Sequence, residues 1–429
     1  MNKNKEYQKY LLRFSFPIII SGIFMTIANV ITNIIISYMG TDELLAKNIF
    51  SKFNSLYLAF NSGFALIFAN YYFKFLTQEA KKKKTFKLSI IGIGLISISI
   101  MFVFILFRKS LFSLYYQGEK AVTIFSNYSM IRALCFPVIG INAFLDYILS
   151  ENNRKRILVG NIIALVIEIV LVWIVVFKTN FDMRTIAMIE IFARMIKLII
   201  FIWPYKKYLK VKVSEEFRFE NIKRIININK KVIIISFITF MNIFVGMIVL
   251  KLYSYVDASR ILCITISDDI LRITANLFVA LSNIVTTQIS PEINNEKDIL
   301  ESRIKNVYKY INKMYIIFFI ITVLFSIVFL KLYNIDYETM KYTIIILWIR
   351  CGLYIATPLT DFHILLLKIK MNIRKLFIAD TIYDFIILLI SFIIYKIFSL
   401  NLIYTVLIYS TLLFIQTIVS KKYVKEMYE

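Results

Sequence analysis

The chain has 429 residues, of which 59% are hydrophobic and 18% are charged. An ordinary soluble protein is about 45–50% apolar and about 25% charged, and even a large soluble domain leaves about a quarter of its chain surface in water. A soluble enzyme, a disordered protein and a disulfide-rich secreted scaffold are therefore excluded, and a polytopic membrane protein is indicated. The net charge of +24 does not indicate nucleic-acid binding, because the basic residues lie in short clusters between long apolar runs.

Apolar runs between charge clusters predict an all-α fold with twelve membrane-spanning helices. Each run is near or above the roughly 20 residues that cross about 30 Å of hydrocarbon. In chain order the predicted spans cover 14–38, 49–73, 88–107, 123–150, 157–177, 185–203, 232–254, 262–290, 314–333, 341–367, 376–395 and 401–420.

The distribution of basic residues predicts the orientation of the chain. Of the 51 Lys and Arg, we count 34 at the two termini and in the even-numbered loops, 12 in the odd-numbered loops and at the span ends beside them, and 5 inside spans. Cytoplasmic loops carry the excess of Lys and Arg. We therefore expect a multi-pass protein of the cytoplasmic membrane with both termini in the cytoplasm.

A basic segment at 205–231 divides the chain into two sets of six spans. We expect an N-terminal lobe at 1–213 and a C-terminal lobe at 214–429. A repeat of about 215 residues supports this division, because Arg132, Pro137 and Asn153-Arg154-Lys155 have counterparts in Arg350, Pro358 and Asn372-Ile373-Arg374-Lys375. Lobes with an even number of spans share one orientation and are related by a pseudo-two-fold axis along the membrane normal, which is a transporter architecture.

Two predicted spans carry polar stripes. The first span has Thr26, Asn29, Asn33 and Ser37 on one helical face. The eighth has Thr265, Asp269, Arg272, Asn276, Asn283 and Thr287, and this stripe covers about 33 Å of helix, the full membrane depth. Either the stripes line a watery cavity, or they supply hydrogen bonds between helices.

Ionisable residues inside spans are the sharpest candidates for function. Glu168 lies roughly 16 Å into the fifth span, where a charge costs at least about 2.5–3.5 kcal/mol. It is either a coupling-ion site or one half of an ion pair with Arg132 or Arg194. Glu190 and Arg194 are four residues apart and can pair along their own helix.

Carboxylates of the C-terminal half raise the same two alternatives. Asp268 or Asp269 can neutralise Arg272, which leaves the other carboxylate for a different role. Asp380 and Asp384 share a face of the eleventh span, so they are either proton carriers or partners of the bases at its cytoplasmic end.

The sequence offers little support for catalysis. It has one histidine, His363, for which packing is favoured over a role in a membrane acyl- or glycosyltransferase. It contains no Walker A motif, no Cys/His metal spacing and no Gly-rich phosphate loop. We therefore expect a protein that is not an enzyme and has no cofactor, and whose driving force is an ion gradient or passive flow.

Two short motifs stand at the start of the chain, Phe16-Pro17-Ile18-Ile19 and Gly40-Thr41-Asp42-Glu43-Leu44-Leu45-Ala46. They resemble the first span and following loop of the MATE multidrug exporters, which belong to a superfamily that also contains lipid-linked oligosaccharide flippases. The segments Arg132–Pro137 and Glu168–Val172 lie where the family has comparable segments.

The resemblance implies export of organic cations and other amphipathic compounds in exchange for Na⁺ or H⁺. Members often have an acidic residue in the first span and an Asn-x-x-x-Asp pair in the fifth. The nearest positions here are Thr32 or Asn33, and Glu168 with Val172. Two expected carboxylates are thus absent, and Glu168 stands at the Asn position.

The first prediction is therefore a monomeric, H⁺- or Na⁺-coupled antiporter for amphipathic or cationic compounds that works by alternating access. Candidates for the coupling ion, including a possible Na⁺ at Glu168, are Glu168, Asn33, Thr32 and Asp384. Candidates for the substrate cleft are Asn29, Asp269, Arg272, Asn276, Asn283, Arg132 and Arg350. The second is a flippase for a lipid-linked glycan whose pyrophosphate meets Arg132, Arg272 and Arg350. Expected partners are the substrate and the lipid bilayer, and not nucleic acid.

Overall fold

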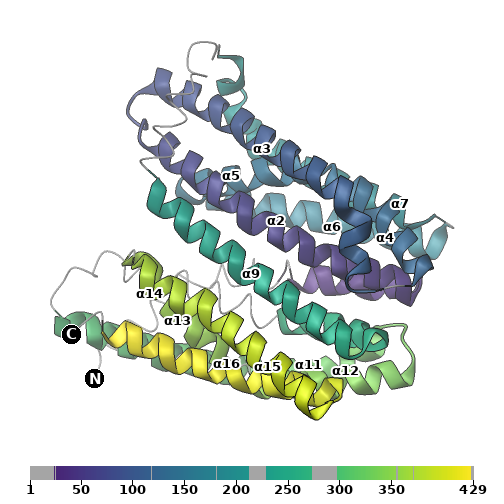
Figure 1. Ribbon diagram of the computed structural model, residues 1–429. Helices are drawn as coiled ribbons and strands as arrows, with labels where there is room; N and C mark the ends of the chain where they lie inside the picture. The colour runs from purple at the N-terminus through teal and green to yellow at the C-terminus, as the bar shows by residue number, and fades with distance from the viewer. Residues whose placement is uncertain are drawn as a thin grey trace. The chain divides into compact units, whose positions relative to one another are not determined.

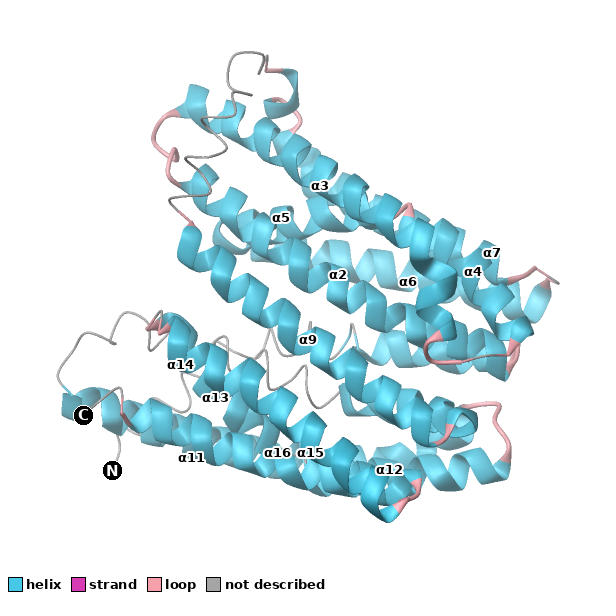
Figure 2. Ribbon diagram, in the orientation of Figure 1, coloured by secondary structure: helices cyan, strands magenta, loops and turns pink. Residues whose placement is uncertain are grey.

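A computed structural model describes residues 24, 26–116, 118–179, 181–211, 229–272, 297–353, 356–370 and 372–426. This part of the chain folds into helices and connecting loops without a β-strand (Figure 2). The predicted all-α fold is confirmed.

Long helices make up most of the described residues (Figure 1). The first described helix is Thr26–Ser37. It is followed by α2 (Thr41–Phe73), α3 (Glu79–Ser113), α4 (Glu119–Ala133), α5 (Phe136–Asn152), α6 (Arg154–Lys178), α7 (Met183–Ile202), α9 (Lys230–Val256), an unlabelled helix at 261–272, α11 (Lys297–Leu332), α12 (Tyr337–Leu353), α13 (Ala356–Ile369), α14 (Ile373–Phe377), a π-helical turn (Ile378–Ile382), α15 (Tyr383–Phe398) and α16 (Leu402–Lys425).

Every predicted span overlaps one of these helices. Within the described residues, five helices are long and apolar enough to cross a membrane, and α4 with α5 would make a sixth as one span bent by 50°. A multi-pass membrane protein is thereby supported, while the count of twelve spans stays a prediction.

Contacts divide the chain into two compact units, each described here by itself. The N-terminal bundle is Tyr38–Phe244, and the C-terminal bundle consists of Met1–Ser37 together with Val245–Glu429. The helix Thr26–Ser37 is therefore grouped with the C-terminal helices, and α9 contributes to both units. The lobe boundaries expected at 213 and 214 stay a prediction.

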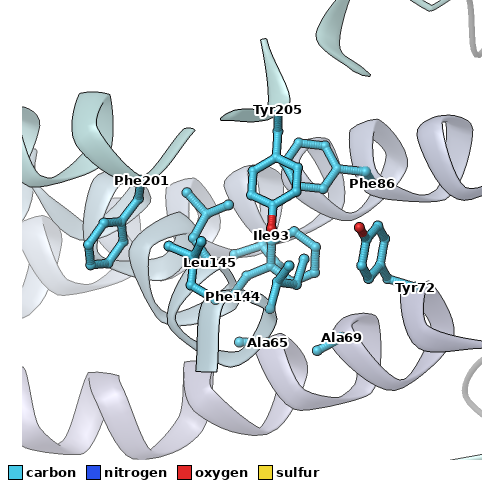
Figure 3. Close-up of a cluster of buried hydrophobic side chains, with 11 residues drawn as sticks. Ala65, Ala69, Tyr72, Phe86, Ile93, Phe144, Leu145, Phe201 and Tyr205 are labelled. Carbon is cyan, nitrogen blue, oxygen red and sulfur yellow. The ribbon is translucent and has the colours of Figure 1, made fainter. Parts of the chain in front are cut away.

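Aromatic side chains fill the core of the N-terminal bundle (Figure 3). Phe86 of α3 stacks on Tyr205 at 4.7 Å between ring centroids. Ala65 and Ala69 lie one turn apart on α2 within the same cluster and are completely buried. Small residues let helix backbones approach closely, and packing of this kind is what holds helices together in a bilayer.

A break between α4 and α5 is stabilised by side chains of two other helices. Pro137 follows the break and cannot donate a backbone hydrogen bond. The hydroxyl of Tyr57 donates to the carbonyl of Phe136 at 2.5 Å and lies 2.9 Å from the hydroxyl of Ser97. The rings of Tyr57 and Phe136 stack at 4.0 Å. Tyr57 thus fixes the start of α5 against α2 and α3 at the break.

Equivalent residues occupy equivalent positions in the two halves of the chain. Arg132 lies in the last turn of α4, and Arg350 lies in the last turn of α12. Downstream, the side chain of Asn153 caps α6 and that of Asn372 caps α14, each by accepting a backbone N–H three residues later. These equivalences support the repeat of about 215 residues that the sequence predicts.

We expect Gly140→Ala to destabilise the N-terminal bundle. A Cβ at this position would lie 2.5 Å from the hydroxyl of Ser97 and 2.6 Å from the amide nitrogen of Asn61. Overpacking of this kind costs about 1–3 kcal/mol, which thermal unfolding of the purified protein would detect. The matched control is Gly94→Ala, because a Cβ there meets nothing within 4 Å. Equal unfolding temperatures for the two variants would contradict the packing described here.

Candidate functional site

A charged cluster lies at the centre of the N-terminal bundle. Glu190 of α7 is 3% exposed. Its carboxylate accepts from Arg132 Nε at 2.5 Å and from the hydroxyl of Tyr128 at 2.6 Å. Lys47 Nζ of α2 lies 3.7 Å from the other carboxylate oxygen. This cluster ties α2, α4 and α7 together through groups that would be costly to bury alone.

The partner of Glu190 differs from the sequence prediction. Pairing with Arg194 along α7 is wrong, because the carboxylate binds Arg132 and Lys47 on other helices. Lys47 lies outside the predicted span 49–73, whereas α2 begins at Thr41 and carries this lysine inside the bundle. Spacing along one helix could not reveal contacts that depend on how helices pack.

Glu168 is the exception among these charges. It lies on α6 and is 5% exposed. It makes no hydrogen bond and no ion pair with the described residues, so the alternative of an ion pair with Arg132 or Arg194 is not realised. The charges that act on it are those of Glu190, Arg194, Lys47 and Arg132. A buried carboxylate held among bases without touching one is able to take up and release a cation.

A second polar contact lies in the C-terminal bundle. The amide nitrogen of Asn33 donates to Asp269 at 2.6 Å, and Arg272 lies 4.0 Å from the same carboxylate. The contact joins the helix Thr26–Ser37 to the helix at 261–272. Asn33 thus has Asp269 as a partner, and Thr32 donates to the carbonyl of Ala28 on its own helix at 2.9 Å.

Arg350 forms a second ion pair in this bundle. Its guanidinium pairs with Asp268 and donates to the hydroxyl of Ser267 at 3.0 Å. Of the two carboxylates that could neutralise Arg272, Asp269 faces Arg272 and Asp268 pairs with Arg350.

Asp384 and Asp380 are 8% and 4% exposed beside the π-helical turn. Gln416 donates to the carbonyl of Ala379 within that turn at 3.0 Å. π-Helical turns of this kind often accompany functional sites.

The remaining predicted residues are Asn29, Asn276, Asn283 and His363. Asn29 is exposed, and Asn276 and Asn283 lie outside the described residues. The ring nitrogen Nδ1 of His363 lies 2.9 Å from the hydroxyl of Ser420 in the interface of α13 and α16, in agreement with the packing role expected for it. In the described ranges, no three His, Cys, Asp or Glu side chains gather into a metal site.

We expect Glu190→Gln to destabilise the N-terminal bundle strongly. The change leaves Arg132 buried without its counter-charge, a loss of about 3–5 kcal/mol for comparable buried pairs. Thermal unfolding of purified variants measures it. The control is Glu119→Gln, since Glu119 is exposed at the start of α4. If both variants unfold at the wild-type temperature, the cluster does not hold the helices together.

Comparisons with known proteins agree with these features. Residues 17–174 match the MatE family model, while no curated protein matches the chain. The chain is similar to the inward-facing conformation of a multidrug resistance MATE family transporter of the MOP superfamily, with a TM-score of 0.75 and 15% identity over 94% of this chain and 95% of that one.

Two further structures are similar over nearly the whole chain. An outward-facing conformation of a multidrug resistance MATE family transporter has a TM-score of 0.71 at 16% identity, over 98% of this chain and 96% of that one. The other is a MOP superfamily transporter from Pyrococcus furiosus Vc1 (DSM3638), with a TM-score of 0.73 at 15% identity over 98% of this chain and 96% of that one. That transporter is described as having a binding pocket of reverse polarity, which suggests a different function. The resemblance seen in the sequence is confirmed for residues 17–174, which match the MatE family model, and the chain as a whole has the fold of the MATE family transporters.

Proposed function

We propose that this protein is a cation-coupled antiporter that exports amphipathic or cationic compounds by alternating access. Glu168 carries the proposal, because it is a buried carboxylate without a hydrogen bond or ion pair to the described residues. In a bilayer such a group needs a proton or a metal cation to offset the cost of its charge. Binding and release of H⁺ or Na⁺ at Glu168 would then couple an ion gradient to export.

Similar structures support alternating access as the mode of transport. Their descriptions include both an inward-facing and an outward-facing conformation. A fold that adopts both states can expose one site to each side of the membrane in turn, with the lobes moving against each other about that site. We place the protein in the cytoplasmic membrane with both termini inside, because of the asymmetry of its basic loops, and we propose that it acts as a monomer.

The C-terminal bundle would supply polar groups for the substrate. Asp269 and Arg272 form one polar contact with Asn33, and Arg350 with Asp268 forms another. A cation or an amphipathic amine can compete for such carboxylates. Asp384 is a second candidate for the coupling ion, because it is a nearly buried carboxylate next to an irregular helical turn.

A flippase for a lipid-linked glycan is the second candidate. Arg132 and Arg350 occupy equivalent places in the two halves, and both lie inside helix bundles. Guanidinium groups bind phosphates in fixed, bidentate geometry. The similarity to a MOP superfamily transporter whose binding pocket of reverse polarity suggests a different function agrees with a function other than multidrug export.

The antiporter proposal predicts that Glu168→Gln abolishes gradient-driven export. The glutamine keeps the size of the side chain but cannot take up or release a cation. Dye efflux from proteoliposomes, driven in turn by a proton gradient and by a sodium gradient, should fall to the level of protein-free vesicles. Glu119→Gln, an exposed carboxylate on α4, should export like the wild type. Undiminished efflux by folded Glu168→Gln would contradict the proposed coupling.

If the protein is a flippase, lipid translocation should depend on Arg350 and not on Glu168. Translocation of a fluorescent lipid-linked glycan across the vesicle membrane should be lost in Arg350→Gln and should persist in Glu168→Gln. Arg184→Gln is the matched control, since Arg184 is exposed at the start of α7. Lipid translocation that needs Glu168 but not Arg350 would exclude this candidate.

A further inference from the structure

Lysines from two distant segments of the chain gather at one end of the N-terminal bundle. The first turns of α3 carry five lysines at 81–87, and the segment 203–211 that follows α7 carries Lys206, Lys207 and Lys210. We call these eight residues the lysine patch. Lys81 and the three lysines of 203–211 are exposed, so their ammonium groups can reach a partner outside the protein.

Aromatic packing and a hydrogen bond hold the segment 203–211 against α3. The ring of Tyr205 stacks on Phe86 at 4.7 Å between centroids (Figure 3), and the ring of Tyr208 meets Phe86 edge-on at 5.5 Å. Lys87 Nζ donates at 2.8 Å to the carbonyl of Val211, which lies 124 residues further along the chain. The two groups of lysines are thus kept side by side by contacts that do not use the exposed lysines.

The lysine patch has far more positive than negative charge around it. The carboxylate of Glu79 lies 3.3 Å from Lys83 Nζ and 4.0 Å from Lys82 Nζ. Glu79 is the one acidic residue in the sequence of 74–87 and 203–211, where we count nine lysines. When the rest of the basic segment up to Lys231 is included, we count 15 Lys and Arg against 4 Asp and Glu. Because like charges repel one another, an anionic partner would stabilise this end of the bundle.

The lysine patch lies at the end of membrane-spanning helices, where lipid headgroups are expected. Its α3 is long and apolar enough to cross a membrane. Trp203, directly after α7, is 59% exposed, and Lys206 Nζ lies 4.5 Å from the centroid of its ring. Tryptophan favours the membrane–water interface, and lysines near helix ends extend towards the headgroups. The patch is therefore within reach of lipid phosphates.

We infer that the lysine patch binds the headgroups of anionic phospholipids in the adjacent leaflet, which is the cytoplasmic one in the orientation proposed above. Clusters of lysines beside a membrane span attract acidic lipids, and each lysine strengthens that attraction about fivefold. Ammonium groups bind phosphate as point charges, so the patch selects a headgroup by its charge. A lipid is favoured over a soluble anion because the exposed ring of Trp203 offers apolar surface beside Lys206.

The fluorescence of Trp203 measures which lipid occupies the patch. The chain has three tryptophans, so Trp173→Phe with Trp348→Phe leaves Trp203 as the reporter in the full-length, reconstituted protein. Brominated lipids quench a tryptophan that they touch. Brominated phosphatidylglycerol should occupy this place about fivefold more readily than brominated phosphatidylcholine. Salt at about 1 M should remove the preference, because it screens exposed charges.

Substitution of two exposed lysines assigns the preference to the patch. Lys206→Gln with Lys207→Gln should lower it at least about twofold. Lys206→Arg with Lys207→Arg keeps both charges and should retain it. Thermal unfolding of each variant establishes that the protein is folded.

Trp173 is the matched reporter at a place without the patch. It is 45% exposed and has Lys178 Nζ 5.8 Å from its ring centroid. It lies about 20 Å along α6 from Gly160, which packs against Phe201 at the patch end of α7. With the other two tryptophans replaced by phenylalanine, Trp173 should prefer the anionic lipid less than about twofold, because few lysines lie near it.

Three results would overturn the inference. They are equal quenching of Trp203 by the two lipids, equal preferences at Trp203 and Trp173, and a preference at Trp203 that Lys206→Gln with Lys207→Gln leaves unchanged. The comparison of the two tryptophans uses the native lysines, so it decides the question even if the lysine variants do not fold. No transport is measured, so none of these results bears on whether the protein is an antiporter.

Discussion

Burial of charge away from water is the constraint on which the rest of this structure depends. Hydrocarbon offers no partner for an ammonium or a carboxylate, so each such group is stable only beside an opposite charge or a hydrogen bond. Glu190 with Arg132 and Lys47, and Asp268 with Arg350, meet that requirement by joining separate helices. These ion pairs fix how the helices of each bundle face one another, and aromatic packing fills the space between them.

The same constraint distinguishes the charges that support the fold from the carboxylate that we propose to bind the coupling ion. Glu190 is saturated by two bases and a tyrosine hydroxyl, which suits a permanent support. Glu168 lies within reach of the same electrostatic field but contacts none of its sources. A group that is surrounded yet unpaired can change its occupancy without disrupting the fold. That difference is why we assign the coupling ion to Glu168 and the packing role to Glu190, although both are buried carboxylates.

Much of the architecture could be predicted from sequence, because apolar length and the positions of caps are local properties. The helices and the equivalence of Asn153 with Asn372 follow from patterns within short segments. The break before Pro137 was not predicted, because the residues 123–150 read as one apolar span. The partners of the charges could not be predicted in this way. Arg132 and Glu190 are 58 residues apart, and Asn33 and Asp269 are 236 residues apart. Such contacts depend on helix rotation and depth, which periodicity leaves open.

Infrared difference spectroscopy on the purified, reconstituted protein would test the role of Glu168 most directly. Addition of a transported dye, or exchange of Na⁺ and pH, should change a carboxyl band in the wild type. The account predicts that this band is absent from Glu168→Gln and is retained in Glu119→Gln, because only Glu168 would exchange its cation when substrate binds. An identical carboxyl change in wild type and Glu168→Gln would contradict the account, since another carboxylate would then carry the coupling ion.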